Sequence, residues 1–327
     1  MSRLIIHIGT HKTATTRLQK VFHRNRDLLE RHGLIYPPSP SVDAHHALVG
    51  VWNEFMRPTP DYDARAAWAD LAARYAGGDK TVFISSEEFC RMNARRVDMA
   101  ELAALAAPFD EVQLICVLRN QASFLQSVYQ QIASSRPPAD WPAYFDRVIE
   151  IRMADGLTLD YNRFYSHLLT GFSRPQIRLI SYDHATRAEG GIIGTWLREL
   201  DLPLSPADLV PVRDEDANIS AEPLATFTAA SLSQPGLLTG TLVGLMQEAL
   251  RQSFGPDRRS TLFTRDEVAR LEEVFAPMNA ALSARVALYQ PGFAMGPMLG
   301  SGAAVWREDL TEEFWITTCR LLERGAA

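Results

Sequence analysis

The chain has 327 residues, of which 46% are hydrophobic and 22% are charged, and its formal net charge at pH 7 is −6. These values are close to the averages of globular proteins, so they exclude a disordered or collagen-like chain and allow a sizeable buried core. The negative charge also argues against a general nucleic-acid binder, because such a protein needs a basic face that neutralises many phosphates.

The amino-terminal residues and the cysteines bear on the cellular compartment. The first apolar run ends at Gly9 and is too short for a signal-peptide core or a membrane span, and no later stretch reaches the length of a membrane-spanning helix. Cys90, Cys116 and Cys319 are odd in number and far apart, which is neither a disulfide framework nor a zinc-binding spacing. We therefore expect a cytoplasmic protein without a membrane span.

In chain order, short apolar runs alternate with longer amphipathic segments. The runs predict buried strands at 4–8, 81–85, 112–118 and 177–181, and residues 33–37 are a further candidate strand. The segments predict helices at 15–32, 64–75, 122–134, 141–153, 161–169 and 192–200. Near-continuous apolar strands separated by helices favour a three-layer α/β fold, in which helices cover both faces of a parallel sheet.

The last third of the chain has a different pattern. After residue 202 we find no convincing strand, and the patterns predict helices at about 221–232, 236–253, 264–285 and 310–324. A Gly/Pro-rich segment at 290–302 is a candidate lid. We expect an α/β core over 1–205 and a mainly helical C-terminal extension over 206–327 that packs on this core.

The turn after the first strand, GTHKTATT at 9–16, has the composition of an anion site. Gly9 allows a sharp exit from the strand, Lys12 supplies a positive charge, and Thr15 and Thr16 place hydroxyl groups at the start of a helix. Backbone N–H groups and the positive end of the helix dipole converge at such a turn. The spacing differs from the triphosphate loop GxxxxGK[ST], because Lys12 follows Gly9 by three residues and no second glycine precedes it.

The stretch HKTATT resembles the 5′-phosphosulfate loop of sulfotransferases that use 3′-phosphoadenosine-5′-phosphosulfate (PAPS), with Ala14 in the place of the usual glycine. The resemblance implies a P-loop-like parallel sheet. It also implies that the donor is held by the loop residues Gly9, His11, Lys12, Thr13, Ala14, Thr15 and Thr16. His11 either touches the ligand or fills the loop.

A second match to this family follows the strand at 112–118. Arg119 lies at the end of that strand and Ser127 lies eight residues further on, the spacing of the arginine and serine that hold the 3′-phosphate in these sulfotransferases. Without this function, Arg119 would cap the sheet and Ser127 would be an ordinary residue of a helix surface. Further stretches that look like the carbohydrate branch of the family include 45–48, 85–89, 159–168, 179–184 and 218–220.

The resemblance also implies roles in catalysis. Lys12 is the candidate for stabilising charge on the leaving group, and Glu87 is the candidate base, with a pKa raised by partial burial. Glu88 either caps the next helix or contacts the acceptor. His45 and His46 either shape the acceptor cleft, serve as an alternative base or form a surface pair.

We expect no metal site, because the histidines lack a recurring ligand spacing. Arg258 and Arg259 either cover the nucleotide or belong to a solvated charged run.

The sequence thus predicts a PAPS-dependent sulfotransferase that acts on a hydroxyl group of a small-molecule or glycan acceptor and releases adenosine 3′,5′-bisphosphate. Two alternatives remain: a P-loop kinase of small molecules, and a nucleotide-binding module without turnover. We expect neither nucleic acid nor a membrane as a partner, and the oligomeric state is left open.

Overall fold

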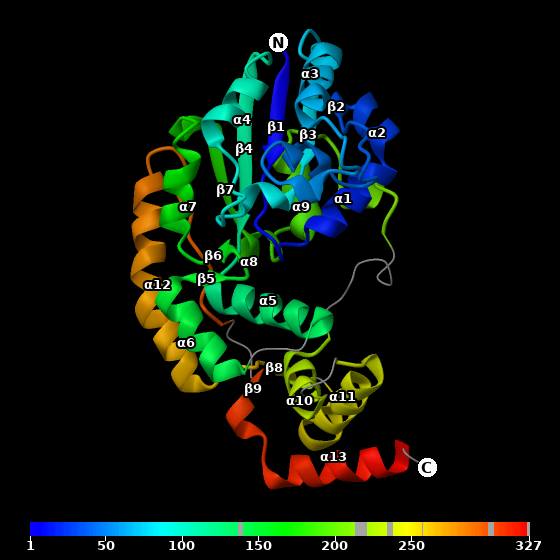
Figure 1. Ribbon diagram of the computed structural model, residues 1–327, viewed down its shortest axis with the longest axis vertical. Coiled ribbons are helices and arrows are strands. Elements are labelled where there is room, and N and C mark those ends of the chain that lie inside the picture. Colours follow the sequence, from blue (N-terminus) through cyan, green and yellow to red (C-terminus); the bar gives the residue numbers. More distant parts are fainter. Residues whose placement is uncertain (137–139, 213–220, 234–237, 257, 300–303, 326–327) are drawn as a thin grey trace. The chain divides into compact units, whose positions relative to one another are not determined.

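The computed structural model describes residues 1–136, 140–212, 221–233, 238–256, 258–299 and 304–325. The chain divides into two compact units, each assembled from three segments (Figure 1). Unit 1 comprises Met1–Arg119, Gly156–Ala217 and Pro277–Gly296, and unit 2 comprises Asn120–Asp155, Asn218–Ala276 and Pro297–Ala327. These boundaries do not coincide with the one expected near residue 205, and the packing of a 206–327 extension on a 1–205 core stays a prediction.

Unit 1 contains the central sheet. Its strands are β1 (Arg3–His7), β2 (Leu34–Ile35), β3 (Thr81–Ser85), β4 (Glu111–Leu118) and β7 (Ile177–Ser181). The strand order is β2-β3-β1-β4-β7, and every neighbouring pair is parallel. The parallel sheet expected from the apolar runs is therefore confirmed, and the candidate strand at 33–37 is a two-residue edge strand.

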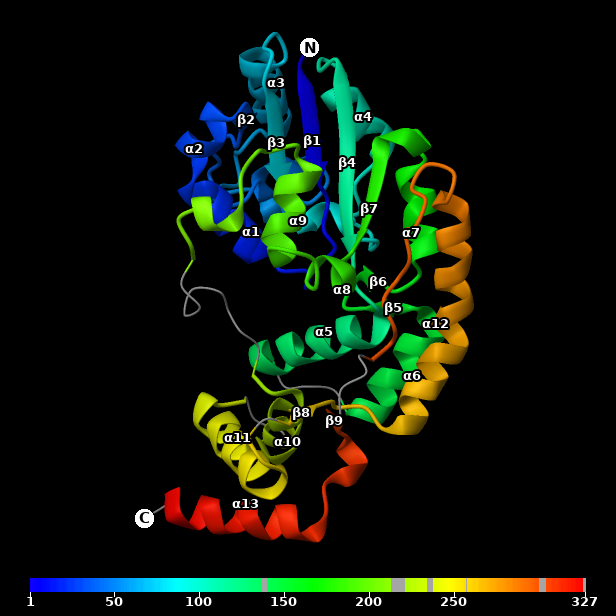
Figure 2. The same cartoon turned by 180° about the vertical axis from the view of Figure 1, so that it is seen from behind.

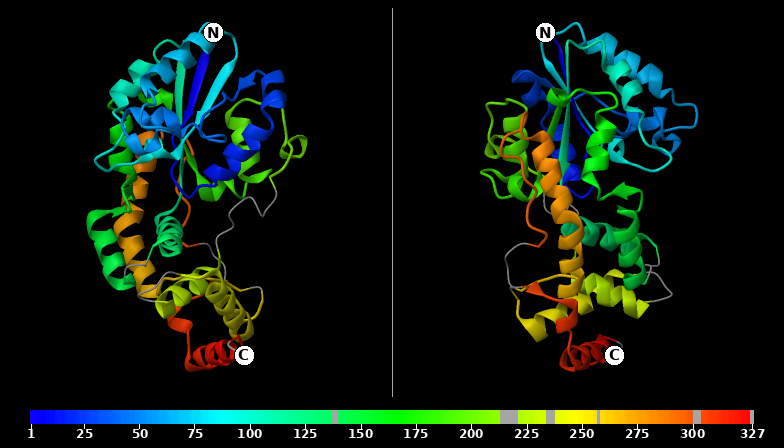
Figure 3. Two further views of the ribbon diagram at one scale, coloured as in Figure 1. Left: turned by 45° about the vertical axis from the view of Figure 1, so that its right-hand side comes forward. Right: turned by 90° about the vertical axis from the view of Figure 1, so that its left-hand side faces the viewer.

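Helices cover both faces of this sheet, which confirms the three-layer fold. The helices of unit 1 are α1 (Thr15–Arg24), α2 (Arg26–Arg31), α3 (Ala64–Tyr75), α4 (Met99–Ala106), α7 (Tyr161–Leu168), α8 (Tyr182–Ala185) and α9 (Gly191–Glu199). One face packs on α1 and α9, which lie in front of the sheet in Figure 2. Figure 3 shows the sheet edge-on between the two helical layers.

The alternation of buried side chains explains this layering. On the first face, Ile5 and Phe83 belong to one core cluster with Phe22 of α1 and Trp196 of α9. Their strand neighbours are also fully buried, and they face the opposite layer because successive side chains of a strand point to opposite faces.

Two features of unit 1 differ from the expected helices. The segment at 15–32 is split at Asn25, whose side-chain Nδ2 donates to the carbonyl oxygens of Val21 (2.8 Å) and Val210 (3.1 Å). The Asn25 side chain thereby links the end of α1 to the segment around Val210. The short helices α4 and α8 were not expected; the N-cap of α4 is Asp98, whose carboxylate accepts from the Glu101 N–H (3.0 Å).

Unit 2 is mainly helical. It contains α5 (Gln121–Ser135), α6 (Trp141–Ile151), α10 (Pro223–Ser233), α11 (Gly240–Phe254) and α13 (Glu312–Gly325). Helix α12 (Arg265–Val286) crosses the boundary between the units at Pro277, and the short strands β5 (Met153–Ala154) and β6 (Leu157–Thr158) flank another boundary. Strands β8 (Arg259–Ser260) and β9 (Ala304–Val305) pair in parallel. The expectation of no strand after residue 202 was therefore wrong, because two-residue strands leave no periodic pattern.

The core of unit 2 combines a helical cluster with a buried tryptophan. Leu224, Met246 and Phe314 pack together at the contact of α10, α11 and α13. Trp141 is 2% exposed, and its Nε1–H donates to Glu267 Oε1 (3.0 Å). Within the described residues, no helix is both long enough and apolar enough to cross a membrane.

Candidate functional site

The loop between β1 and α1 lies at the centre of the sheet. Because β1 is the middle strand, its carboxyl end is flanked by the carboxyl ends of β3 and β4. The backbone holds the loop against β4: Thr10 N–H donates to the Val117 carbonyl (2.7 Å), and Val117 N–H donates to the Gly9 carbonyl (2.6 Å). Inside the loop, Thr13 Oγ1 donates to the Thr10 carbonyl (2.6 Å). These bonds give the loop a defined shape.

The N-terminus of α1 has the properties of an anion site. Its N-cap, Ala14, provides no side-chain hydrogen bond, and the first turn contains no acidic residue. The N–H groups of that turn therefore lack intrahelical partners and can donate to a ligand. Lys12 and Ala14 have positive φ angles of 63° and 61°, so the loop uses left-handed backbone at non-glycine positions.

Gly9 allows the loop to approach the segment that follows β3. Its φ angle is 98°, and a Cβ atom there would come within 3.2 Å of both Cys90 Sγ and Glu87 Cα. A side chain at this position would be strained by the backbone and by its neighbours. The glycine thus brings the candidate donor loop next to the candidate base.

Arg119 extends the cationic side of the site. Its Nη1 donates to the Lys12 carbonyl (2.9 Å), and its guanidinium lies 5.1 Å from the centre of the Tyr182 ring. Its Nε is buried and has no hydrogen-bond partner among the described residues. Burial lowers the pKa of Arg119, against the opposing effects of Tyr182 and Asp183. Burial and the charge of Arg119 likewise lower the pKa of Lys12. A bound anion would relieve both groups, because it satisfies the orphan donor and offsets the repulsion.

Glu87 begins the 3-10 segment η3 (Glu87–Cys90) directly beyond β3. Gln19 of α1 donates from Nε2 to Glu87 Oε2 (2.9 Å) and to Ser85 Oγ (3.2 Å). Burial acts to raise the pKa of Glu87, but the charges of His46 and His11 and the hydrogen bond from Gln19 outweigh it, so the pKa lies below its usual value. The raised pKa expected from partial burial is wrong, because burial is not the only effect of the surroundings.

His11 contacts η3, and a contact of His11 with the donor stays a prediction. Its Nδ1 lies 3.3 Å from Cys90 Sγ, and its Nε2 lies 3.1 Å from Glu88 Oε1. Burial opposes the imidazolium, but Cys90, Glu88 and Glu87 together raise the pKa of His11 to about 10. Glu88 also pairs with Arg91 through Nη2 (3.2 Å).

Against the cost of burial, His11 and Arg91 lower the pKa of Glu88 to about 2. A buried ion cluster therefore fastens the loop to η3. The carboxylate of Glu88 is engaged in this cluster, and a contact of Glu88 with the acceptor stays a prediction.

The histidine pair is divided between two environments. His45 is 2% exposed; its Nδ1 accepts from the Ser85 N–H (3.1 Å), and its Nε2–H donates to the Pro37 carbonyl (3.0 Å). Burial lowers the pKa of His45 to about 4. His46 is partly exposed, and its Nδ1 lies 2.8 Å from Ser86 Oγ. His45 is thus a neutral buried side chain whose two nitrogens are engaged, which argues against His45 as the base, whereas His46 remains beside Glu87.

Some expected site residues lie elsewhere. Ser127 is a buried residue of α5 in unit 2, whereas Arg119 ends unit 1, so their joint binding of a phosphate stays a prediction. Arg258 and Arg259 also belong to unit 2, and the family-like stretch at 218–220 lies outside the described residues.

The beginning of the candidate lid is fastened within unit 1. Gln290 exchanges two hydrogen bonds with the backbone of β7, to Ile177 (3.0 Å) and from Leu179 (2.7 Å). Gly296 approaches Asp183 so closely that an added Cβ would lie 2.6 Å from the Asp183 Cβ. A role of the 290–302 segment as a lid stays a prediction, and residues 300–302 lie outside the described residues.

A pocket beside the α1 N-terminus was not expected from the sequence. It has a volume of about 400 Å³ and is bordered by Ala14 and Arg17 of the β1–α1 loop and α1, by Tyr182, and by Gly190 and Gly191 at the start of α9. Both glycines have positive φ angles, 71° and 61°. The Gly-Gly pair is the one sequence signal that could have drawn attention to this region.

The comparisons with known proteins give matches among solved structures, and two of these are distant. No family model and no curated protein sequence matches the chain. Among solved structures, a sulfotransferase from Alicyclobacillus acidocaldarius is similar at 14% identity and a TM-score of 0.47, with 86% of this chain and 94% of that chain covered. The sulfotransferase domain from the curacin biosynthetic pathway is similar at 10% identity and a TM-score of 0.38, with 84% and 98% covered. At these values neither likeness assigns a function to the chain.

Proposed function

We propose that this protein is a sulfotransferase that transfers a sulfuryl group from PAPS to a hydroxyl group of a sugar or glycan acceptor. The observation that carries the proposal is that a set of positively charged and N–H groups, which can cradle an anion, lies next to an ionised carboxylate. Gly9 allows the two to come close. Lys12, Arg119 and the uncapped start of α1 form the cradle, and Glu87 is the carboxylate. In-line transfer of a charged group to a hydroxyl needs both parts in one place.

The residues of the cradle fit the donor. When bound, PAPS supplies an activated sulfuryl group and a phosphate leaving group. The orphan Nε of Arg119 and the free N–H groups of the first turn of α1 would donate to its anionic groups. Lys12 would neutralise the charge that develops on the leaving oxygen, a role for which a mobile ammonium group is suited.

The pocket beside α1 would receive the nucleoside of the donor. It begins at Ala14, next to the phosphate cradle, and Tyr182 provides an aromatic side chain at its border. Because the guanidinium of Arg119 lies over the same ring, Tyr182 connects the pocket to the cationic side of the site. A flat base is held well by an aromatic side chain, since stacking needs no specific hydrogen bond.

Glu87 would act as the base. Its lowered pKa keeps the carboxylate ionised at neutral pH, so that it can take the proton of the acceptor hydroxyl as the oxygen attacks sulfur. Gln19 fixes one carboxylate oxygen by a hydrogen bond of 2.9 Å, which orients the group. The proton moves from the acceptor oxygen to Glu87, while the negative charge of the leaving group remains with Lys12.

A P-loop kinase is the second candidate, because a carboxylate at the end of the strand next to β1 can hold Mg²⁺ in such enzymes. Glu87 has this position. Glu87 lies beside His11, however, whose raised pKa keeps its ring cationic, and this cation would repel a divalent ion. The surroundings of Glu87 therefore favour the sulfotransferase.

Ligand binding distinguishes the two enzymes. We expect adenosine 3′,5′-bisphosphate to raise the melting temperature without a metal, and Mg-ATP to have no comparable effect. Arg119→Met should abolish this stabilisation, because it removes the buried guanidinium. Arg163→Met is the matched control, since Arg163 is an exposed arginine of α7 in the same unit. Stabilisation by Mg-ATP alone would overturn the proposal in favour of the kinase.

Turnover distinguishes an enzyme from a binding module. Glu87→Gln keeps the shape of the side chain but removes the base, so we expect sulfate transfer from labelled PAPS to fall at least about 100-fold with unchanged binding of adenosine 3′,5′-bisphosphate. Equal activity of the variant and the parent would remove Glu87 from the mechanism. If the parent binds the nucleotide but transfers sulfate to no sugar, phenol or lipid alcohol, the chain is a binding module.

A further inference from the structure

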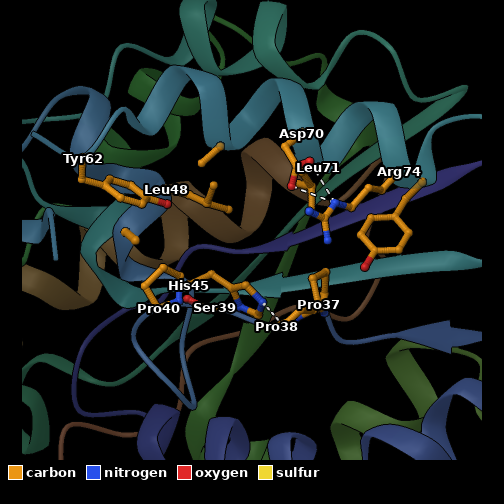
Figure 4. Close-up of a pocket in the computed structure, with 13 residues that line it drawn as sticks. Pro37, Pro38, Ser39, Pro40, His45, Leu48, Tyr62, Asp70, Leu71 and Arg74 are labelled. Carbon is orange, nitrogen blue, oxygen red and sulfur yellow. Dashed lines mark hydrogen bonds and ion pairs between the residues drawn. The ribbon is translucent and has the colours of Figure 1, made fainter.

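A second pocket lies in unit 1, between α3 and the loop that follows β2. Its volume is about 320 Å³. Figure 4 shows Asp70, Leu71 and Arg74 of α3 on one side and the segment Pro37–Pro40 with His45 on the other. A volume at the low end of the range for small-molecule sites, ~300–1,000 Å³, suits a single ring-sized ligand.

The walls of this pocket are rigid. Three prolines, Pro37, Pro38 and Pro40, restrict the backbone of one side. His45 donates to the Pro37 carbonyl (3.0 Å) and so closes the loop on itself. The other side is held by Trp68, a 1% exposed residue of α3 whose Nε1–H donates to the Leu48 carbonyl (3.1 Å). A pocket built in this way exists before its ligand arrives, which lowers the entropic cost of binding.

The chemistry of the lining favours an uncharged ring with hydroxyl groups. Tyr62, Tyr75 and the prolines offer flat apolar surfaces that suit the C–H face of a sugar. Asp70 and Arg74 form an ion pair (2.9 Å) with side chains that are 57% and 58% exposed, so both remain accessible to a ligand. Together they present acceptors and donors with no net charge, which suits hydroxyl groups and gives no preference to an ionic ligand.

Short hydrogen-bonded connections join the pocket to the candidate base. His45 lines the pocket and makes two hydrogen bonds with the backbone of Ser85. Its backbone N–H donates to the Ser85 carbonyl (2.9 Å), and its side-chain Nδ1 accepts from the Ser85 N–H (3.1 Å). The next residue, His46, contacts Ser86 Oγ (2.8 Å), and Glu87 follows directly. The wall of the pocket and the base are therefore built on the same end of β3.

We propose that this pocket binds a neutral pyranose ring of the acceptor, one that does not itself react but holds the acceptor beside Glu87. That the bound molecule is an acceptor rests on the proposed function. The binding of the ring depends only on the pocket. The pocket, formed by α3 and the 37–48 loop, is then a second recognition site beside the donor site. It selects acceptors that contain such a sugar ring.

A pair of alanines on α3 allows a controlled test. Ala67 lines the pocket, whereas its neighbour Ala66 is exposed and does not. Ala67→Phe should fill the pocket, and Ala66→Phe adds the same ring to the outside of the same helix. The probes are methyl glucopyranoside, methyl galactopyranoside and N-acetylglucosamine at millimolar concentrations, followed by saturation-transfer NMR, with glucuronic acid and phenol as comparisons.

We expect saturation transfer to at least one neutral pyranoside with the parent and with Ala66→Phe, and its loss with Ala67→Phe. Asp70→Ala changes a largely exposed side chain and should weaken the binding about tenfold without disturbing the fold, so it keeps the test decisive if Ala67→Phe does not fold. The proposal is overturned if no neutral pyranoside binds, if glucuronic acid or phenol binds better, or if Ala67→Phe and Asp70→Ala leave binding unchanged.

Adenosine 3′,5′-bisphosphate separates this result from the proposed function. Its stabilising effect should be equal in the parent, Ala66→Phe and Ala67→Phe, because the donor site is formed by other residues. Sugar binding without nucleotide binding would count against the sulfotransferase and leave the sugar pocket in place. Nucleotide binding without sugar binding would count against the sugar pocket and leave the sulfotransferase proposal in place.

Discussion

The ion cluster of His11, Glu88 and Arg91 predicts a specific pH dependence of stability. We consider Glu88→Gln, which keeps the size of the side chain and removes its charge. The side chains of Glu88 and His11 are only 12% and 11% exposed, so their interaction is weakly screened by solvent. The pKa of Glu88 falls from 4.5 to about 2, which corresponds to a stabilisation of about 3 kcal/mol near pH 6. This magnitude agrees with the cost of breaking a buried ion pair, roughly 3–5 kcal/mol.

The sign of the pH dependence follows from the two shifted groups. Glu88 has a lowered pKa, so its contribution is present above pH 4.5 and is lost as the pH falls through about 2. His11 has a raised pKa, so its contribution is complete below pH 6.5 and is lost as the pH rises through about 10. The difference in unfolding free energy between parent and variant should therefore be largest between pH 4.5 and 6.5. It should shrink toward pH 10, where only the pairing with Arg91 remains.

Urea unfolding across this pH range measures the difference, and NMR titration of the His11 ring should show a lower pKa in the variant. The matched control is Glu248→Gln, because Glu248 pairs with Arg251 at the same sequence spacing as Glu88 and Arg91 but on an exposed surface of α11. We expect no measurable loss of stability from this control, since exposed ion pairs contribute little. A loss in Glu88→Gln that does not vary with pH would refute the reasoning.

Three further predictions concern the candidate donor loop and the candidate base. Gly9→Ala should weaken binding of adenosine 3′,5′-bisphosphate in calorimetry, because φ is 98° and the added Cβ would lie 3.2 Å from Cys90 Sγ; equal affinity would contradict the close approach. Because the pKa of Glu87 lies below 4.5, the acid limb of kcat/KM for sulfate transfer should lie below pH 4.5; a limb near neutrality would point to a histidine. Gln19→Leu should move that limb upward by removing the hydrogen bond to Glu87, and an unmoved limb would exclude this effect.

The sequence predicted the sheet better than the helices. Strands β3 and β7 have the expected limits, because short apolar runs between polar turns identify strands that are buried on both faces. Helix α3 also agrees to the residue. The break at Asn25 was missed, since the side chain that divides the helix bonds to Val210, 185 residues further on.

The candidate site was predicted in part. The loop at 9–16 and the strand ends carrying Glu87 and Arg119 do come together in unit 1, as the rule for the carboxyl ends of parallel strands leads one to expect. The roles of individual side chains were less predictable. His45 was expected to shape the acceptor cleft, to serve as an alternative base or to lie on the surface. It is buried, burial lowers its pKa to about 4, and Ser85 and Pro37 engage both of its nitrogens, which argues against the base and the surface.

The sequence by itself determined the parallel sheet and the position and composition of the anion-binding turn, because strand patterns and turn chemistry depend on neighbouring residues. Only the tertiary structure decided the charge states at the site. His11 meets Glu88 and Cys90 across 77 and 79 positions of sequence, and these contacts set the pKa values of His11 and Glu88 and, through His11, that of Glu87. Electrostatic interactions depend on distance and burial in space, and neither can be read from the order of residues.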